Sequence, residues 1–245
     1  MRTDGETGGF VAGVDGCRAG WLVVLRGRRT GALSARVVPD FEAVLAQGPP
    51  PAVIGVDMPL GLLGAAVPGG RTCDLLARRL LGARAASVFS APTRPALLAF
   101  RAGGGYRRVS QANKGGSPSA PGLSRQTYNL LEKIDKLDRL LPAAQCAVVE
   151  VHPELSFREA GGAPMRSAKR TAAGRAEREG LLARLGYGEL LSSPRRDDLR
   201  GSARDDLLDA CIVSWTAERV AAGRALKIPP APPTDERGLP MAIFR

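Results

Sequence analysis

Three short apolar segments that each carry an acidic residue at or near their end constrain the fold of this chain most. The segments are residues 10–15 with Asp15, Ala52–Val56 with Asp57 directly after it, and Cys146–Val151 with Glu150. Continuous rather than alternating apolarity is typical of strands covered on both faces, and an acid at the edge of a core is costly unless something compensates it. Ligands of α/β sheets gather at the carboxyl ends of strands. If the three strands lie side by side and point the same way, their acids converge at one sheet edge.

The remaining segments complete an α/β pattern. Further strands are predicted at 21–26, 33–38 and 241–244, and helices at 41–45, 72–81, 95–100, 124–141, 175–185 and 205–222. Residues 103–122 are polar and rich in glycine, so we predict a loop there, either a functional flap or disordered. We expect one domain over residues 10–245, a mixed sheet flanked by helices, with a mostly helical insertion at about 59–144 before the fifth strand.

The composition says less about the binding partners of the chain than the strand pattern says about its fold. A net charge of +11 favours phosphate-bearing partners, but the excess is mostly arginine, a bias that a GC-rich genome also produces. No run of about 18 apolar residues occurs, so no membrane partner is expected. The first residues, MRTDGETGG, lack the plan of a signal peptide, and the four cysteines lie far apart. These features indicate the reducing cytoplasm.

Two acids of the last predicted helix extend the acidic set. Asp206 and Asp209 are three residues apart and share a helix face, and Asp205 with Asp209 is a second choice of pair. Converging carboxylates must be protonated or neutralised by cations. Hard oxygen ligands without a cysteine or histidine cluster point to Mg²⁺ or Mn²⁺. Two such ions about 3.5–4 Å apart can clamp the attacking water and the leaving oxygen of a phosphodiester, and we expect Gly13 and Gly16 to leave space for the substrate.

Each acid also has a purely structural interpretation. Asp15 followed by glycine is a turn signal. Acids in the first turn of a helix are favoured by the helix dipole, and Ser202 with Asp205 forms a predicted capping box. Glu150 is harder to explain structurally, because its segment is otherwise apolar.

Five other residues are candidates for substrate binding. His152 lies two residues after Glu150 and shares its side if the strand continues, although a hydrogen-bonded structural histidine is the alternative. Lys169 and Arg175, in SAKRTAAGRAER, can bind phosphate or form a solvated helix start. Arg78 and Arg84 offer the same possibility with less specificity.

Taken together, the motifs resemble those of the domain of unknown function 429 family. The motifs, in order, are GVDGCRAGW, GVDMPLGL, RTCDLLARRLLGARAASVFSAPTR, VVEVHPELSF, KRTAAGRAER and DDLLDA. The resemblance runs from Gly13 to the C-terminal strand. It implies a predicted nuclease with an RNase H-like fold, similar in plan to resolvase-type Holliday junction nucleases.

The resemblance also implies roles for individual acids. The first-strand acid of the RNase H-like plan falls on Asp15, the acid at the end of the fourth strand on Asp57, and the final-helix acids on Asp206 and Asp209. Glu150 matches the family's own E-V-H-P-E motif rather than a general RNase H-like position. The insertion is larger than in the minimal fold.

The leading functional hypothesis is therefore a metal-dependent nuclease acting on DNA or RNA. Asp15 would bridge the ions, Asp57, Asp206 and Asp209 would complete their shells, and Glu150 would ligate or orient water. One alternative is a phosphotransferase of the actin and sugar-kinase type, which the sequence Cys17-Arg18-Ala19 after Gly16 disfavours. Another is a non-catalytic module that binds nucleic acid or docks a partner, for which an aromatic content of 4% offers few stacking platforms.

Overall fold

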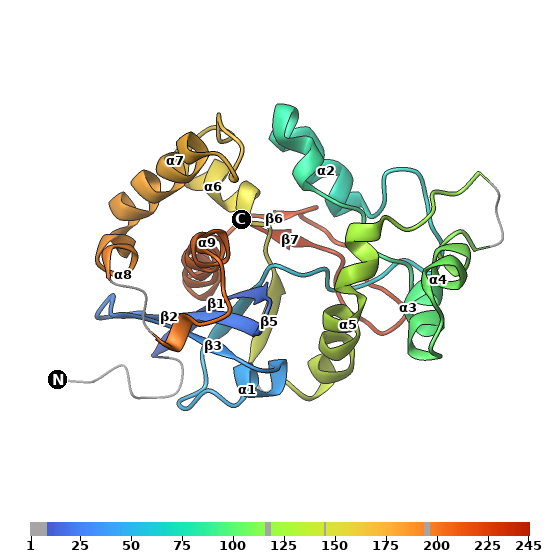
Figure 1. Cartoon of the computed structure of the whole chain (residues 1–245), viewed down its shortest axis with the longest axis horizontal. Helices are drawn as coiled ribbons and strands as arrows, with labels where there is room; N and C mark the ends of the chain where they lie inside the picture. Colours follow the sequence, from blue (N-terminus) through green and yellow to red (C-terminus); the bar gives the residue numbers. More distant parts are fainter. Residues whose placement is uncertain (1–8, 116–118, 145, 194–196) are drawn as a thin grey trace. The chain divides into compact units, whose positions relative to one another are not determined.

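Figure 1 shows the computed structural model of the chain, which describes residues 9–115, 119–144, 146–193 and 197–245. The predicted α/β class, with a mixed sheet flanked by helices, is confirmed. The chain forms two compact units. The first comprises residues 1–58, 140–226 and 244–245, and the second comprises 59–139 and 227–243. The expectation about a signal peptide concerns residues 1–8, which lie outside the described part.

The first unit contains a five-stranded sheet with the order β3-β2-β1-β4-β5. Its strands are β1 (Phe10–Cys17), β2 (Gly20–Gly27), β3 (Leu33–Val38), β4 (Val53–Val56) and β5 (Ala147–Glu150). β2 runs antiparallel to both β1 and β3, whereas β4 runs parallel to both β1 and β5. The three strands that carry acids therefore lie side by side and point the same way, as the sequence predicts.

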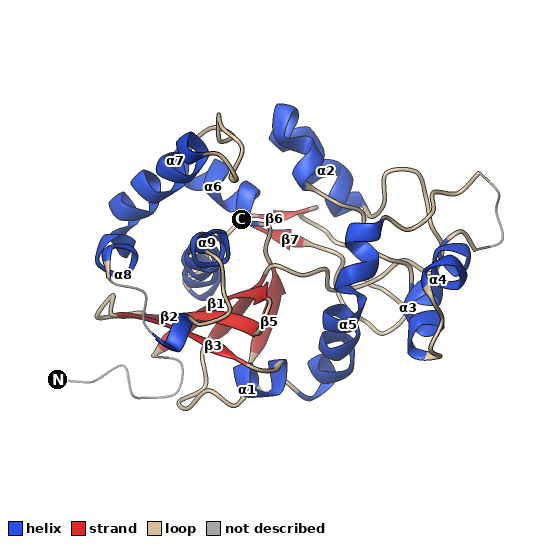
Figure 2. Ribbon diagram, viewed as in Figure 1, coloured by secondary structure: helices blue, strands red, loops and turns tan. Residues whose placement is uncertain are grey.

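Helices cover both faces of this sheet (Figure 2). The helical elements of the unit are α1 (Phe41–Leu45), α6 (Pro153–Gly161), α7 (Ala172–Leu182), a π-turn (Ala183–Tyr187), α8 (Gly188–Ser192) and α9 (Arg204–Ala221), with short 3₁₀ turns at Leu141–Ala143 and Asp197–Leu199. On one face α9 packs on β1, β2 and β4, and α6 and α7 pack on α9. On the other face Phe41 of α1 meets Trp21 edge to face, with ring centroids 5.2 Å apart.

Two glycines allow α9 to lie directly on the sheet. A Cβ on Gly13 would stand 2.2 Å from both the Ala210 carbonyl oxygen and the Ser214 amide nitrogen. On Gly55 it would lie 2.9 Å from the Val213 side chain. Both contacts are closer than carbon atoms tolerate, so only glycine fits. The expectation that Gly13 leaves space for substrate was wrong, because the α9 backbone fills that space.

The second unit is mainly helical. It contains α2 (Thr72–Leu81), a 3₁₀ helix (Gly82–Ser87), α3 (Arg94–Arg101), α4 (Tyr106–Asn113), most of α5 (Arg125–Leu140) and β6 (Lys227–Ile228), which pairs with β7 (Ile243–Phe244). Arg94 is buried and forms ion pairs with Asp138 at 2.5 Å and Asp235 at 2.7 Å. These ion pairs link α3, α5 and the 227–243 segment into one unit.

Several predicted boundaries hold, and two expectations fail. The strand over 33–38 and the helix over 41–45 are confirmed to the residue. The prediction of a loop over 103–122 was wrong, because α4 occupies Tyr106–Asn113 within it. The third acid-bearing strand is also less buried than expected, since the three residues before Glu150 are exposed or half-buried. Within the described ranges, no helix combines the length and apolarity needed to cross a membrane.

Candidate functional site

Asp15 and Asp57 stand next to each other at the carboxyl ends of two parallel strands. Both follow the tripeptide pattern Gly-Val-Asp, and the pairing aligns Gly13 with Gly55. The Asp57 amide donates a hydrogen bond of 3.0 Å to the Val14 carbonyl, which extends the ladder to the acids. Because side chains alternate along a strand, each aspartate lies on the same face as the glycine two residues before it. That face is the one covered by α9.

Asp209 reaches the same place from α9. Gly13 contacts α9 at Ala210, the neighbour of Asp209, so the close approach of helix and strand brings Asp209 towards the end of β1. Its side chain is almost completely buried, with an exposed fraction of 2% for the residue. The site therefore collects carboxylates from two strands and one helix that are far apart in sequence.

Asp206 lies at the edge of this group and caps the helix. Its Oδ2 accepts a hydrogen bond of 2.7 Å from the Ala203 amide, which satisfies a donor that the helix start would otherwise leave unpaired. The predicted capping box of Ser202 with Asp205 was wrong, because the Ser202 hydroxyl donates to the Leu199 carbonyl instead. Asp206 remains close enough for its charge to act on Asp15.

The four acids disfavour one another's charge. Burial, followed by the charges of Asp57, Asp209 and Asp206, raises the pKa of Asp15 well above its usual range. Burial also raises the pKa of Asp57 to about 7 and that of Asp209 to about 6, although Lys169 opposes both shifts. A group of neighbouring carboxyls that all have raised pKa values indicates a place where a cation is stabilised.

Lys169 is the cation that the fold itself supplies to these acids. Its Nζ donates a hydrogen bond of 2.7 Å to Asp209 Oδ2, and the side chain is 43% exposed. Burial acts against the charge of this group, but Asp209, Asp57 and Asp15 together raise its pKa above the ordinary value. The sequence placed Lys169 among the substrate-binding candidates, and the structure brings it to the acids.

Glu154, in the first turn of α6, is a further acid near the group and was not predicted. Its charge raises the pKa values of Asp57 and Asp209. Arg178 of α7, which is fully buried, donates to Glu154 Oε1 at 2.5 Å from Nη2 and at 3.1 Å from Nε. The sequence signal was Pro153, which marks a helix start directly after the acid-bearing strand and so puts Glu154 near the sheet edge.

Glu150 lies on the other face of the sheet from Asp15 and Asp57, and His152 lies after the end of β5. Glu150 pairs in register with Val56 rather than with Asp57, so its side chain lies on the opposite face of the sheet. β5 ends at Glu150, and His152 is the N-cap residue of α6, so the strand does not continue through it. The register thus separates Glu150 from the acids that the structure brings together.

The three predicted arginines are distributed over the two units. Arg175 Nε is 3.9 Å from Asp205 Oδ1, an ion pair that joins α7 to α9. Arg78 belongs to the second unit, where it donates to the carbonyls of Val88 and Gly69 and to the Ser90 hydroxyl. Arg84 lies in the 3₁₀ helix that follows α2 in the same unit.

Comparison with known proteins gives a family assignment. The model of the family described as "Protein of unknown function (DUF429)" matches residues 13–234, which include all the acids described above. The chain belongs to the DUF429 family. No curated protein and no solved structure matches the chain.

The acids of this DUF429 chain fit a divalent metal ion by their chemistry. Asp15, Asp57 and Asp209 offer only hard oxygen donors, which Mg²⁺ and Mn²⁺ prefer, and their raised pKa values reflect a need for positive charge. Among the described residues, no three Asp, Glu, His or Cys side chains already surround one point as a metal shell does. The cation that Asp209 contacts here is Lys169.

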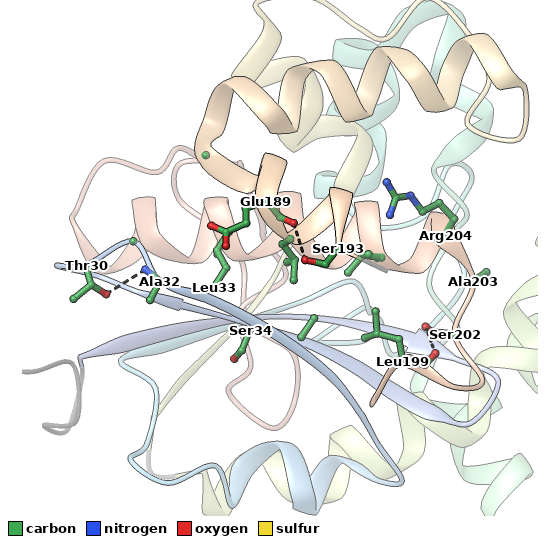
Figure 3. A pocket seen from close by; sticks show the side chains of 15 residues that line it. Thr30, Ala32, Leu33, Ser34, Glu189, Ser193, Leu199, Ser202, Ala203 and Arg204 are labelled. Atoms are coloured by element: carbon green, nitrogen blue, oxygen red, sulfur yellow. Dashed lines mark hydrogen bonds between the residues drawn. The ribbon is translucent and has the colours of Figure 1, made fainter. Parts of the chain in front are cut away.

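A cavity of about 420 Å³ lies beside the start of α9 (Figure 3). Its wall is formed by the start of β3, by α8 and by the segment Ser202–Arg204. The described residues that line it include none of the four acids and not Lys169. Arg204, on its rim, already donates to Glu179 Oε1 at 2.8 Å. We therefore place the candidate site at the acids and not in this cavity.

Proposed function

We propose that the first unit is a metal-dependent phosphodiester hydrolase with an RNase H-like arrangement, acting on nucleic acid. The observation that carries the proposal is the convergence of Asp15, Asp57 and Asp209 from β1, the end of β4 and α9. These are the first-strand, fourth-strand and final-helix acids that the RNase H-like plan requires. Side chains that only cap helices or form turns have no reason to collect at one buried place.

The chain's own residues divide the work as follows. Asp15 is central, because the charges of three other acids act on it. Asp57 and Asp209 flank it from the neighbouring strand and from the helix, and Asp206 contributes charge from the rim while it caps α9. These carboxylates would hold a Mg²⁺ or Mn²⁺ ion, which would supply Lewis acidity for the attack of a water on phosphorus. No covalent intermediate on the protein is needed.

A polyanionic substrate suits the surroundings of the acids. Arg18 follows β1 by one residue, and Arg170 is next to Lys169; both are exposed. Arg200 is exposed as well, and the turn that carries Arg18 is tied to the segment of Arg200 by a hydrogen bond from the Ala19 amide to the Gly201 carbonyl. Guanidinium groups bind phosphate oxygens well. We propose DNA or RNA as the substrate, and a cytoplasmic location in keeping with four free cysteines.

The test is calorimetric titration of Mn²⁺ and Mg²⁺ into the wild type, Asp15→Asn and Asp209→Asn, with and without an oligonucleotide. Asp198→Asn, at an exposed aspartate of the same unit, is the matched control. We expect both site variants to lose binding by at least tenfold and the control to keep it. Cleavage of labelled single-stranded and duplex DNA and RNA is then measured with the same proteins.

The outcomes separate the functional alternatives. Metal-dependent cleavage that Asp15→Asn abolishes supports the hydrolase. Equal oligonucleotide binding by wild type and Asp15→Asn, with or without Mg²⁺ and with no cleavage, would instead identify a non-catalytic nucleic-acid-binding module. Lack of metal binding even with an oligonucleotide present would exclude the proposed function.

A further inference from the structure

Lys169 brings an ammonium group to the acids. Its Nζ is 2.7 Å from Asp209 Oδ2, the distance of a strong charge-assisted hydrogen bond. The interaction also extends to Asp57 and Asp15, whose charges act on the same ammonium group. Lys169 is therefore a counter-ion of the whole acidic group and not of Asp209 alone.

The loop that carries Lys169 is held firmly in place. Glu177 of α7 accepts hydrogen bonds from the amides of Arg166 at 2.9 Å and Ser167 at 3.1 Å. Arg178, which is paired with Glu154, donates to the Ser167 carbonyl at 3.1 Å. The loop is thus anchored before Lys169 by the buried Arg178 and by the carboxylate of Glu177.

The same loop is also anchored after Lys169. The Thr171 hydroxyl donates to the Ala168 carbonyl at 2.8 Å and accepts from the Gly174 amide at 3.0 Å. A Cβ on Gly174 would come within 2.0 Å of the Ala168 carbonyl oxygen, so the loop lies directly against the first turn of α7. Anchoring on both sides places the lysine backbone at a fixed position, as a structural cation requires.

The three converging carboxylates balance with one metal ion in addition to Lys169, when Asp206, which caps α9 on the rim, is left out of the count. Asp15, Asp57 and Asp209 carry three negative charges when ionised. One divalent ion together with the ammonium group supplies three positive charges. Two divalent ions in addition to Lys169 would supply five, a surplus of two positive charges over these three carboxylates.

We propose that Lys169 replaces one of the two cations of a two-metal hydrolase, so that this site binds a single divalent ion. The inference rests on the proposed function and specifies how many metal ions the site takes. In this arrangement Lys169 holds Oδ2 of Asp209, and Asp15, Asp57 and the other oxygen of Asp209 are left for the ion. Lys169 is a positioning residue for the acids, and its fixed charge takes over the neutralising role of the second ion.

The experiment measures metal stoichiometry in the full chain, which is a readout independent of activity. Mn²⁺ is titrated into the wild type, Lys169→Met and Lys169→Arg by calorimetry, and bound Mn²⁺ is examined by electron paramagnetic resonance. We expect one Mn²⁺ per chain in the wild type and in Lys169→Arg, with the spectrum of an isolated ion. In Lys169→Met we expect a second Mn²⁺, and two ions about 3.5–4 Å apart give a spin-coupled spectrum.

Lys136→Met is the matched control. Lys136 also pairs with a carboxylate, Glu132 at 2.9 Å, but both side chains are exposed and belong to α5. We expect its metal stoichiometry to equal that of the wild type. Thermal melts show whether each variant is folded, and Lys169→Gln replaces Lys169→Met if the latter is not.

Three results would overturn the inference. Two Mn²⁺ ions in the wild type would show that Lys169 does not take a cation position, and a single ion in a folded Lys169→Met or Lys169→Gln would show the same. In both cases metal-dependent cleavage can persist, so the proposed function would survive. No Mn²⁺ binding to the wild type or Lys169→Met, with or without an oligonucleotide, would overturn both proposals together.

Discussion

Gly13 and Gly55 are register partners on the parallel strands β1 and β4, and α9 lies against both of them. Each glycine precedes an aspartate by two residues, so the two positions that let the helix approach also fix the face on which Asp15 and Asp57 stand. The repeated Gly-Val-Asp sequence therefore encodes two things at once, the contact of helix and sheet and the orientation of the acids.

This relationship predicts the effect of Gly13→Ala. The added methyl group would meet backbone atoms of Ala210 and Ser214 at 2.2 Å, and backbone cannot rotate away as a side chain can. We expect a loss of about 3 kcal/mol in the free energy of unfolding, or a fall in Tm of roughly 6–12 °C for a chain of this length. Gly105→Ala is the control, since a Cβ there meets nothing within 4 Å, and it should change Tm by less than about 2 °C. Equal melting of Gly13→Ala and the wild type would contradict the close packing of α9.

Asp15→Asn should stabilise the metal-free protein at neutral pH. The substitution removes the charge of a buried carboxyl whose pKa is raised by burial and by three neighbouring acids. We expect an increase in the free energy of unfolding, measured by denaturant titration in the presence of a chelator. Added Mn²⁺ should raise the Tm of the wild type and leave that of Asp15→Asn unchanged. A destabilised Asp15→Asn would show that the Asp15 charge is well compensated in the metal-free state.

The stability of the metal-free protein should fall as pH rises from about 4 to about 7. Asp57 and Asp209 have pKa values raised to about 7 and about 6 in the folded state, from an ordinary value of 3.8. In this range the folded state keeps protons that the unfolded state has released, so their contribution is complete below pH 4 and is lost as pH rises through the folded values. Thermal melts from pH 4 to 8 should show a smaller decline for Asp57→Asn than for the wild type. Parallel curves for the two proteins would contradict the raised pKa of Asp57.

Glu150→Gln tests the register of β5. Because Glu150 pairs with Val56, its side chain lies on the face opposite Asp57, and we expect Mn²⁺ affinity within about twofold of the wild type. Asp57→Asn, at the adjacent strand end, should weaken binding by at least tenfold. If both variants lost binding equally, Glu150 would belong to the metal site after all.

Gly174→Ala tests the anchoring of the Lys169 loop. The new Cβ would lie 2.0 Å from the Ala168 carbonyl oxygen, so the loop must move away from α7. We expect a loss of about 1–3 kcal/mol in stability. Gly180→Ala, in the same helix, meets only the Arg184 guanidinium at 4.0 Å and should gain about 0.5–1 kcal/mol. Equal stability of the two variants, measured by urea titration, would show that the loop is free to adjust.

The sequence predicts where the strands lie better than it predicts how deeply each strand is buried. Residues 33–38 and 41–45 are recognisable from local pattern alone, because each is bounded by turn residues. α4 was missed since Gly103–Gly105 precede it and its polar residues resemble a loop. The buried side chains of Val109 and Asn113 hold it in place, and such tertiary packing cannot be read from local composition.

The sequence predicts those site residues whose position follows from the order of the strands or from the face of a helix. Asp15, Asp57 and Asp209 follow from strands that end together and from a helix face, and the structure brings them together. Glu150 could not be separated from them, because its face depends on a one-residue register that apolar segments do not reveal. The pairing of Lys169 with Asp209 depends on a loop conformation fixed by Glu177, Arg178 and Gly174, and none of these residues signals that contact locally.

The contact of α9 with β1 also determines when the site can exist. Asp15 is synthesised before Lys169, and Lys169 before Asp209. A nascent chain still lacking α9 leaves Gly13 and Gly55 uncovered and has no complete acidic group. The acidic group, and any chemistry that depends on it, can therefore form only after α9 has left the ribosome and packed on the sheet.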